Sequence, residues 1–186
     1  LDALQGLQKK LVELQTINNI NNIMSVEVDL FNLYSVIHKE ITKVMGNVDF
    51  LIAIYDAKTN HIRIPYIYEG SEALALDPFP LGEGLTSLLI KTKKPLLLDH
   101  DTTEQAIAMG AKVIGKPAQS WLGVPLMVAG DVVGAVIVQD VEHEYRFNQD
   151  DVNLLTTLAP QIAISVRNAQ LLHEMELALQ AYDQER

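Results

Sequence analysis

The sequence of 186 residues contains no cysteine, and this absence excludes several kinds of chemistry. Without a thiol the chain has no disulfide framework, no cysteine-ligated zinc site and no iron–sulfur cluster. It also lacks a thiolate nucleophile and an attachment point for a cofactor held through a cysteine thioether. Its function must therefore rest on other side chains and on the shape of the fold.

Basic residues are scarce relative to acidic ones. Lysine and arginine number 14 against 24 aspartate and glutamate residues, so the formal net charge is −10. A protein that binds nucleic acid without sequence preference needs a basic surface, so we expect no nucleic-acid partner. The apolar share of 48% is ordinary for a globular core and argues against a disordered chain.

Long hydrophobic runs and a signal peptide are also missing. The run from Val132 to Val138 is far too short to span a bilayer, and the first residues have neither a basic nor an apolar region. We therefore expect a cytoplasmic location and no membrane contact. The length of 186 residues suggests one domain with extensions. Because the chain starts without methionine and ends in a helical pattern, we interpret it as a piece of a longer protein.

The N-terminal residues have the period of a coiled-coil helix. Leucine recurs at spacings of three and four, at Leu4, Leu7, Leu11 and Leu14. The phase then changes, since isoleucine recurs every third residue from Ile17 to Ile23 with asparagines between. Such a stammer overwinds a supercoil, and asparagine is a modest helix former. We expect the helix to be weakest at this stretch.

A second helix is predicted from Asp29, which suits an N-cap, to Gly46 and Asn47, which typically end a helix. Two β-rich runs, 50–55 and 61–68, follow and are separated by turn residues, as in an antiparallel hairpin. In the second run Ile62, Ile64, Tyr66 and Tyr68 alternate with other residues. Pro65 favours an edge position for that strand.

A second hairpin is predicted over residues 120–129 and 132–140, joined by Gly130-Asp131 in a tight turn. Between the two hairpins we expect a loop, a helix over 84–92, a strand over 95–99 and a helix over 103–109.

The last segment is predicted to be one long helix. Asn148 suits its N-cap, with Asp151 three residues on, and Pro160 should bend it. Over residues 149–185 it would reach about 55 Å, longer than a small domain is wide. A coiled-coil seam continues to its end, through Leu172, Met175, Leu179 and Tyr182.

Four stretches, taken in order, carry a resemblance to a known family. They are residues 80–85 (PLGEGL), 94–99 (KPLLLD), 120–136 (with SWLGVPL and GDVVGAV) and 147–169 (starting FNQDDVNLL). Together they make residues 24–172 similar to a GAF domain of a bacterial signalling protein.

The resemblance implies an α+β fold with a central antiparallel sheet. The terminal helices would form a bundle on one face, and loops and short helices would enclose a ligand cavity on the other. It also implies a homodimer through the terminal helices and a covalently linked output domain, such as a histidine kinase or a nucleotide cyclase. We therefore divide the chain into a signalling helix (1–23), the GAF domain (24–172) and a helical linker (173–186).

The ligand cavity implied by the resemblance would take a small organic or anionic molecule. Trp121 would supply a flat apolar face and one donor, while Asp99 and Gln139 would fix polar groups. The alternative is that Trp121 fills the cavity. The full set expected to bound it is Tyr66, Tyr68, Leu85, Leu98, Asp99, Trp121 and Gln139.

Other functions of the family are disfavoured by particular residues. Bilin attachment and the methionine sulfoxide reductase activity of some relatives depend on cysteine. The cyclic-nucleotide motif is an Asn-Lys pair, then Phe-x-x-x-Asp-Glu; Phe147 and Asp151 match, but Val152 stands in place of the glutamate and the Asn-Lys pair is missing. Haem needs an axial ligand, and we place none of the five histidines in an apolar context. No cofactor is expected.

Several short motifs are interpreted as structural. Asp99-His100-Asp101 and Glu142-His143-Glu144 look metal-like, but neighbouring strand residues point to opposite faces, so solvated loops are the better interpretation. Gly82-Glu83-Gly84 is read as a turn that starts a helix rather than as an anion site. His173-Glu174 resembles the phosphoacceptor pair of a histidine kinase, but Arg and Pro do not follow. We expect neither a catalytic residue nor a metal ligand.

We conclude that the sequence favours a sensory or regulatory module that is not itself an enzyme. It would dimerise through its terminal helices and pass a small-ligand or upstream signal to an output domain, with a histidine kinase favoured. Two alternatives stay open: a ligand-free dimerisation spacer, and a cyclic-nucleotide-binding domain of a cyclase or phosphodiesterase.

Overall fold

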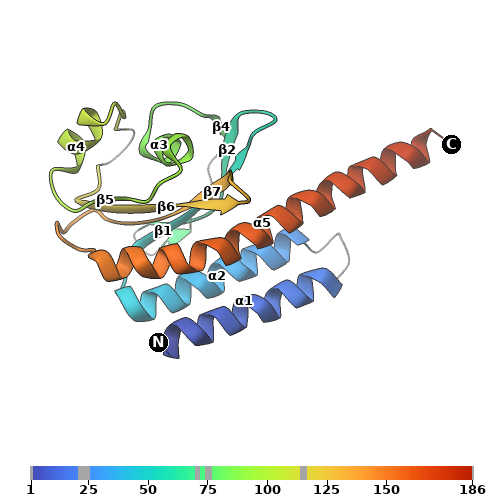
Figure 1. Ribbon diagram of the computed structural model, residues 1–186, viewed down its shortest axis with the longest axis horizontal. Helices are drawn as coiled ribbons and strands as arrows, with labels where there is room; N and C mark the ends of the chain where they lie inside the picture. The colour runs from blue at the N-terminus through green and yellow to red at the C-terminus, as the bar shows by residue number, and fades with distance from the viewer. Residues whose placement is uncertain (1, 21–25, 70–71, 74–76, 114–116, 186) are drawn as a thin grey trace.

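The computed structural model describes residues 2–20, 26–69, 72–73, 77–113 and 117–185 (Figure 1). The elements follow one another as α1 (Asp2–Ile20), α2 (Val26–Met45), β1 (Asp49–Asp56), β2 (His61–Glu69), β3 (Glu72–Ala73), β4 (Phe79–Pro80), α3 (Leu85–Thr92), β5 (Leu96–Leu98), α4 (Thr102–Ala108), β6 (Ser120–Val128), β7 (Asp131–Asp140) and α5 (Gln149–Gln184).

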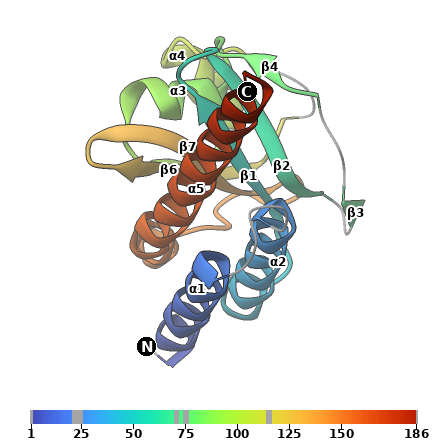
Figure 2. The same ribbon diagram turned by 90° about the vertical axis from the view of Figure 1, so that its right-hand side faces the viewer.

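The strands form one antiparallel sheet in the order β3-β2-β1-β7-β6-β5, with β4 also paired to β2. Helices α1, α2 and α5 lie side by side on one face, and α3, α4 and their loops cover the other (Figures 1 and 2). Two apolar cores result, one on each face. The α+β fold with a helix bundle on one face is therefore confirmed.

Both predicted hairpins are present, with one shift in a turn. Strands β1 and β2 pair through Phe50 and Tyr68, and β6 pairs with β7 through Val128 and Asp131. The turn of the second hairpin lies at Ala129-Gly130, one residue before the predicted pair. Their φ angles of +51° and +85° are both positive, as a type I′ turn requires.

A β-bulge interrupts the pairing of β1 with β2. Ile52 lies opposite Tyr66, but Ile54, two residues on, lies opposite Arg63, so β2 has one extra residue there. An extra residue reverses which side chains face which side of a sheet. Pro65 lies in the bulge, between the ends of β2 that pair with β3 and β4. The predicted edge position is therefore confirmed at Pro65, which has no strand partner on its outer side among the described residues. It is wrong for the two ends of β2, which pair with β3 and β4.

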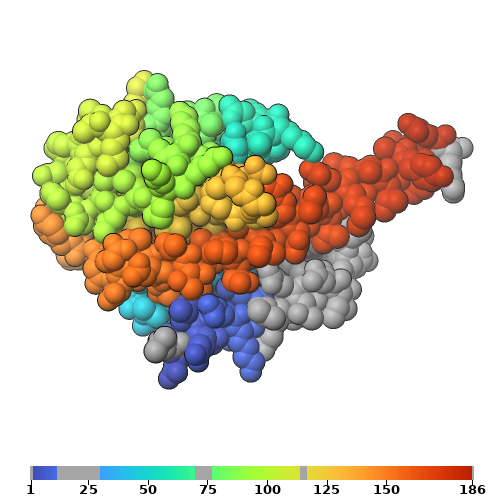
Figure 3. All heavy atoms as spheres, in the orientation of Figure 1, coloured from blue at the N-terminus to red at the C-terminus, as the bar shows by residue number. Residues whose placement is uncertain are grey.

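Helix α5 runs as one element, as predicted, and its end extends beyond the body of the molecule (Figure 3). The Asn148 side chain accepts from the backbone N–H of Asp151 at 3.1 Å, and the Asp151 carboxylate accepts from the N–H of Asn148 at 3.0 Å. This reciprocal capping box fixes the start of the helix. Among the described residues no helix has the length and apolar character to cross a bilayer.

Helix α1, whose leucines have the period of a coiled-coil seam, packs against its own domain. Its Leu7 and Leu11 are only 2% and 0% exposed, because α1 packs against α2 and α5 of the same chain (Figure 2). Leucines spaced three and four apart suit a bundle within one chain as well as a dimer seam, so their spacing does not choose the partner.

The second helix begins earlier than predicted. Since α2 starts at Val26, Asp29 lies inside its first turns and is not the N-cap. Helix α1 ends at Ile20, inside the stretch that we expected to be weakest. The rest of that stretch, residues 21–23, lies outside the described residues.

The packing of α1 gives the first testable prediction. Leu11→Ala should lower the free energy of unfolding by about 2–4 kcal/mol, because it leaves a cavity in a fully buried site. Leu177→Ala, at an exposed site on α5, should change it by less than about 0.5 kcal/mol. Urea unfolding at equilibrium measures both. Equal effects of the two substitutions would contradict the intramolecular packing of α1.

Candidate ligand pocket

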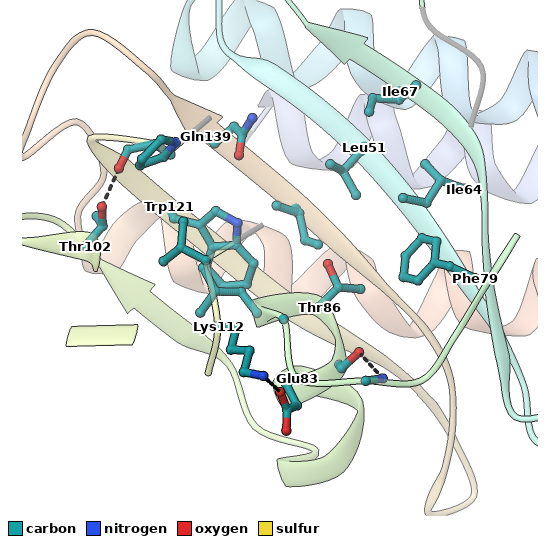
Figure 4. Close-up of a pocket in the computed structure, with 18 of the residues that line it drawn as sticks. Leu51, Ile64, Ile67, Phe79, Glu83, Thr86, Thr102, Lys112, Trp121 and Gln139 are labelled. Carbon is teal, nitrogen blue, oxygen red and sulfur yellow. Dashed lines mark hydrogen bonds and ion pairs between the residues drawn. The ribbon is translucent and has the colours of Figure 1, made fainter. Parts of the chain in front are cut away.

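A cavity of about 610 Å³ lies between the sheet and the layer formed by α3, α4 and their loops (Figure 4). This volume is in the range of small-molecule sites. Its lining is mostly apolar, with a few polar and charged groups. The residues that line it are Leu51, Ile64, Ile67, Glu69, Asp77, Phe79, Pro80, Gly82, Glu83, Gly84, Leu85, Thr86, Ser87, Thr102, Thr103, Lys112, Val113, Pro117, Ala118, Trp121, Ile137, Gln139 and Val141.

Alternate residues of the central strands form the floor of the pocket. Leu51 of β1 pairs with Ile137 of β7, and Gln139 of β7 pairs with Trp121 of β6. Paired residues share one face of a sheet, so these four side chains line the cavity from the sheet side. Leu51, Trp121 and Gln139 are labelled in Figure 4. The residues between them face the helix bundle.

Trp121 is the single tryptophan of the chain and is only 5% exposed. Its ring lies close to Gly123, where an added Cβ would come within 2.6 Å of the ring atom Cη2. The glycine therefore leaves the space that the ring needs. The indole N–H has no hydrogen-bond partner among the described residues and is left as a donor at the cavity.

An ion pair joins the two loops that cover the mouth of the pocket. Lys112 Nζ lies 2.7 Å from Glu83 Oε2, and the backbone N–H of Lys112 donates to the Glu83 carbonyl at 2.7 Å. The hydrogen bond to Lys112 lowers the pKa of the Glu83 carboxyl and raises that of Lys112. Both side chains are exposed, so the pair adds little stability by itself.

The backbone groups of Gly82, in the Gly82-Glu83-Gly84 turn, form hydrogen bonds within the protein. The N–H of Gly82 donates to Ser87 Oγ at 3.0 Å, and its carbonyl accepts from Lys91 Nζ at 2.6 Å. Gly84 is the N-cap residue of α3. These contacts support our interpretation of the motif as a turn that starts a helix.

Three of the predicted site residues, Leu85, Trp121 and Gln139, line the pocket. Leu98 belongs to the apolar core on the same face but does not line the cavity. The Asp99 carboxylate instead accepts from His100 Nδ1 at 2.6 Å. The sequence analysis missed the lining residues of the sheet edge and of the covering loops, because no local pattern indicates that a loop residue faces inwards.

Tyr66 and Tyr68 do not lie at the pocket, and their placement there was wrong. The bulge at Pro65 reverses the alternation of β2, so Ile64 faces the cavity whereas both tyrosines pack on the helix side. A regular alternation would have placed Ile64 and the tyrosines on one face.

The two tyrosines instead surround His38 of α2. The His38 ring stacks on Phe50 at 5.1 Å between centroids, and its Nδ1 lies 2.9 Å from Tyr66 Oη. His38 is only 7% exposed, and within the described residues its Nε2 has no partner. One histidine therefore does lie in an apolar setting, contrary to our expectation. Burial lowers the pKa of His38.

The two triplets that look metal-like come together at one end of the sheet. The N–H of Tyr145 donates to the Asp99 carbonyl at 2.6 Å, and the N–H of Asp101 donates to Glu144 Oε2 at 3.2 Å. The rings of His100 and Tyr145 stack at 5.2 Å. In the part of the chain that the structure describes, no three such side chains converge as metal ligands.

The buried His38 gives a pH prediction. Its pKa lies below the ordinary 6.5 in the folded state, so the unfolded chain binds the proton more readily. Stability should therefore fall as the pH drops below about 6.5, by about 1.4 kcal/mol for each unit of pKa shift. In His38→Phe this part of the pH dependence should disappear. Urea unfolding of both proteins from pH 8 to pH 5 tests this, and parallel curves would contradict it.

Comparison with known proteins identifies the family. A model of the GAF domain matches residues 28–167 of this chain. The GAF domain of an Acinetobacter phosphoenolpyruvate-protein phosphotransferase is 17% identical, with a TM-score of 0.64 over 88% of this chain and 94% of that one.

Two further structures have the same fold. Residues 122 to 287 of a methyl-accepting chemotaxis protein are 14% identical, with a TM-score of 0.66 over 86% of this chain and 98% of that one. Free methionine-R-sulfoxide reductase from Neisseria meningitidis, solved with its substrate, is 14% identical, with a TM-score of 0.63 over 89% and 90%. GAF domains generally serve as sensory and regulatory modules of signalling proteins, and the reductase shows that GAF-fold enzymes also exist. This chain belongs to the GAF domain family.

Proposed function

We propose that this GAF domain is a sensory module that binds a small organic molecule in its pocket and relays the binding through α5 to an output domain. The observation that carries the proposal is that the pocket floor and the projecting helix share two strands. Both β6 and β7 have one face on the cavity and the other against α5.

Neighbouring residues of β6 connect the two sides. Trp121 lies at the cavity, and the next residue, Leu122, lies in the core that includes Leu155, Leu158 and Ile162 of α5. Protein interiors are close-packed, so a shift of the strand under a ligand has to be taken up by the helix. Ligand binding would thereby change the relative populations of two positions of α5.

The end of α5 supports dimerisation. Ile164, Leu171, Met175 and Leu179 are between 42% and 54% exposed, and their spacing places them along one side of the helix. Exposed apolar residues in such a stripe favour a coiled coil with a second copy of the chain. The predicted Leu172 is instead half-buried against the core of its own domain. A linked output domain, with a histidine kinase favoured, would follow this helix.

The proposed module acts by binding and is not itself an enzyme. The methionine sulfoxide reductase activity of relatives depends on cysteine, which this chain lacks. The same absence excludes a thioether-bound chromophore, so the ligand of the proposal is a freely exchanging small molecule. No cofactor is part of the proposal.

A ligand screen with a filled-pocket variant tests binding. Thr86 points into the cavity, so Thr86→Trp should occupy part of it (Figure 4). Amino acids, organic acids, amines, cyclic nucleotides and nitrate are screened by thermal shift. A ligand at about 100 times its Kd should stabilise the wild type by about 2.7 kcal/mol and the variant much less. If no compound separates the two proteins, the ligand-free spacer is favoured.

Two matched charge substitutions test the dimer. Met175→Glu introduces a charge on the exposed stripe, and Leu177→Glu introduces the same charge about 200° round the helix. Met175→Glu should raise the dimer Kd at least about tenfold and Leu177→Glu less than about twofold. Sedimentation velocity over a concentration series measures both. A monomeric wild type, or equal effects of the two charges, would refute this interface.

A further inference from the structure

The polar groups at one end of the pocket form a row across four strands. Gln139 pairs with Asp49 on one side and with Trp121 on the other. Phe50 pairs with Tyr68, so the next position places Asp49 opposite Glu69. The row therefore runs Glu69, Asp49, Gln139, Trp121, and all but Asp49 line the cavity.

Two carboxylates in this row repel each other. Burial, and after it the nearby charge of Asp49, raises the pKa of the Glu69 carboxyl. Like charges directly opposite each other destabilise a sheet. No basic side chain lies within ion-pair distance of Glu69 among the described residues. The sheet thus keeps an unfavourable charge at the wall of a mostly apolar pocket.

The basic group of the pocket is already engaged. Among the described residues of the lining, the charged ones are Glu69, Asp77, Glu83 and Lys112. Lys112 forms its ion pair with Glu83 at the mouth, so the remaining charge of the lining is negative. An anionic ligand would meet repulsion that no free cation among the described lining residues offsets, whereas a cation would relieve the repulsion between Glu69 and Asp49.

Gln139 adds a second acceptor. Its Nε2 donates towards Asp49 Oδ2 at 3.5 Å, which leaves its side-chain oxygen as an acceptor at the pocket. Trp121 lies beside Gln139 (Figure 4). Trp121 is only 5% exposed, and its N–H has no partner among the described residues. The face of an indole ring also attracts cations.

We propose that the ligand is a small organic cation, with an ammonium group at Glu69 and the Gln139 oxygen and an apolar body against Trp121. This inference rests on the proposed sensory function and names the chemical class of its ligand. The sequence analysis expected a small organic or anionic ligand, and this inference narrows the expected ligand to an organic cation.

Trp121 fluorescence provides a direct test, because Trp121 is the single tryptophan and lines the site. The wild type is titrated with three probes of matched shape: 2-phenylethylammonium, 2-phenylethanol and 3-phenylpropanoate. A parallel series uses hexylammonium, hexanol and hexanoate. The ammonium probe should bind about tenfold more tightly than the alcohol, and the carboxylate most weakly.

Glu69→Gln should remove the tenfold advantage of the ammonium probe and leave the affinity for the alcohol unchanged. Without ligand this variant should melt about 1–3 °C higher than the wild type at pH 7, because the repulsion with Asp49 is gone. Glu142→Gln removes the same charge from an exposed site outside the pocket lining and should preserve the advantage. A structural role for Glu69 would instead lower the melting temperature and weaken all probes.

The outcomes separate this inference from the proposed function. If the alcohol binds and the ammonium probe binds no better, or if Glu69→Gln keeps the tenfold ratio, the ligand class is wrong and the binding pocket stands. A carboxylate that binds most tightly likewise overturns the class alone. If neither series changes the fluorescence, the result contradicts both the proposed ligand class and the proposed binding of a small organic molecule in the pocket.

Discussion

The alternation of side chains along β6 and β7 is the constraint on which the rest of the structure depends. Each of these strands has a paired neighbour on both sides, and most of their residues are buried. One set of alternate residues completes the core beneath α5, and the other set forms the floor of the cavity. Because both sets belong to the same backbone, a shift of the pocket floor also displaces residues that pack against the helices.

Close backbone packing keeps these strands in place. Gly134 of β7 lies so near the carbonyl of Ala53 in β1 that a Cβ at this position would clash with it. Gly123 of β6 leaves space for the Trp121 ring in the same way. Gly134 thus permits the close pairing of β7 with β1, and Gly123 permits the position of the Trp121 ring on the pocket floor.

The pocket combines a rigid floor with a cover held by exposed contacts. The floor consists of sheet residues whose backbone groups are paired on both sides. The cover consists of the turn before α3 and the segment after α4, joined by the exposed pair of Glu83 and Lys112. Exposed ion pairs contribute little, so this pair by itself adds little to the stability of the cover.

The position of Glu69 is unfavourable in the free domain, as is common for charged groups in binding sites. A carboxylate that is half-buried near a second carboxylate lowers the stability of the free domain. A polar group that destabilises the free protein stabilises a complex when its ligand supplies the missing partner. In the proposed function, the charge distribution of the lining determines the ligand class and the cavity volume limits the ligand size.

Much of the fold could be predicted from local patterns. Strand alternation, the Asn148 capping box and the leucine spacing indicated the elements, and the order of four short stretches indicated the family and the two layers. The pocket residues were only partly predictable. Trp121, Gln139 and Leu85, which the family resemblance implied, do line the pocket, but the covering loops carry no periodic signal.

The sequence by itself determined most of the helices and longer strands, because hydrophobic period and capping residues act within a few neighbours. The tertiary structure decided three matters that depend on distant partners. It turned α1 back onto its own domain, although its leucines suit a dimer seam equally well. It placed a bulge at Pro65 that moved Tyr66 and Tyr68 to the opposite face. It also brought Glu69 opposite Asp49, since strand register is a property of the paired chain and not of either strand alone.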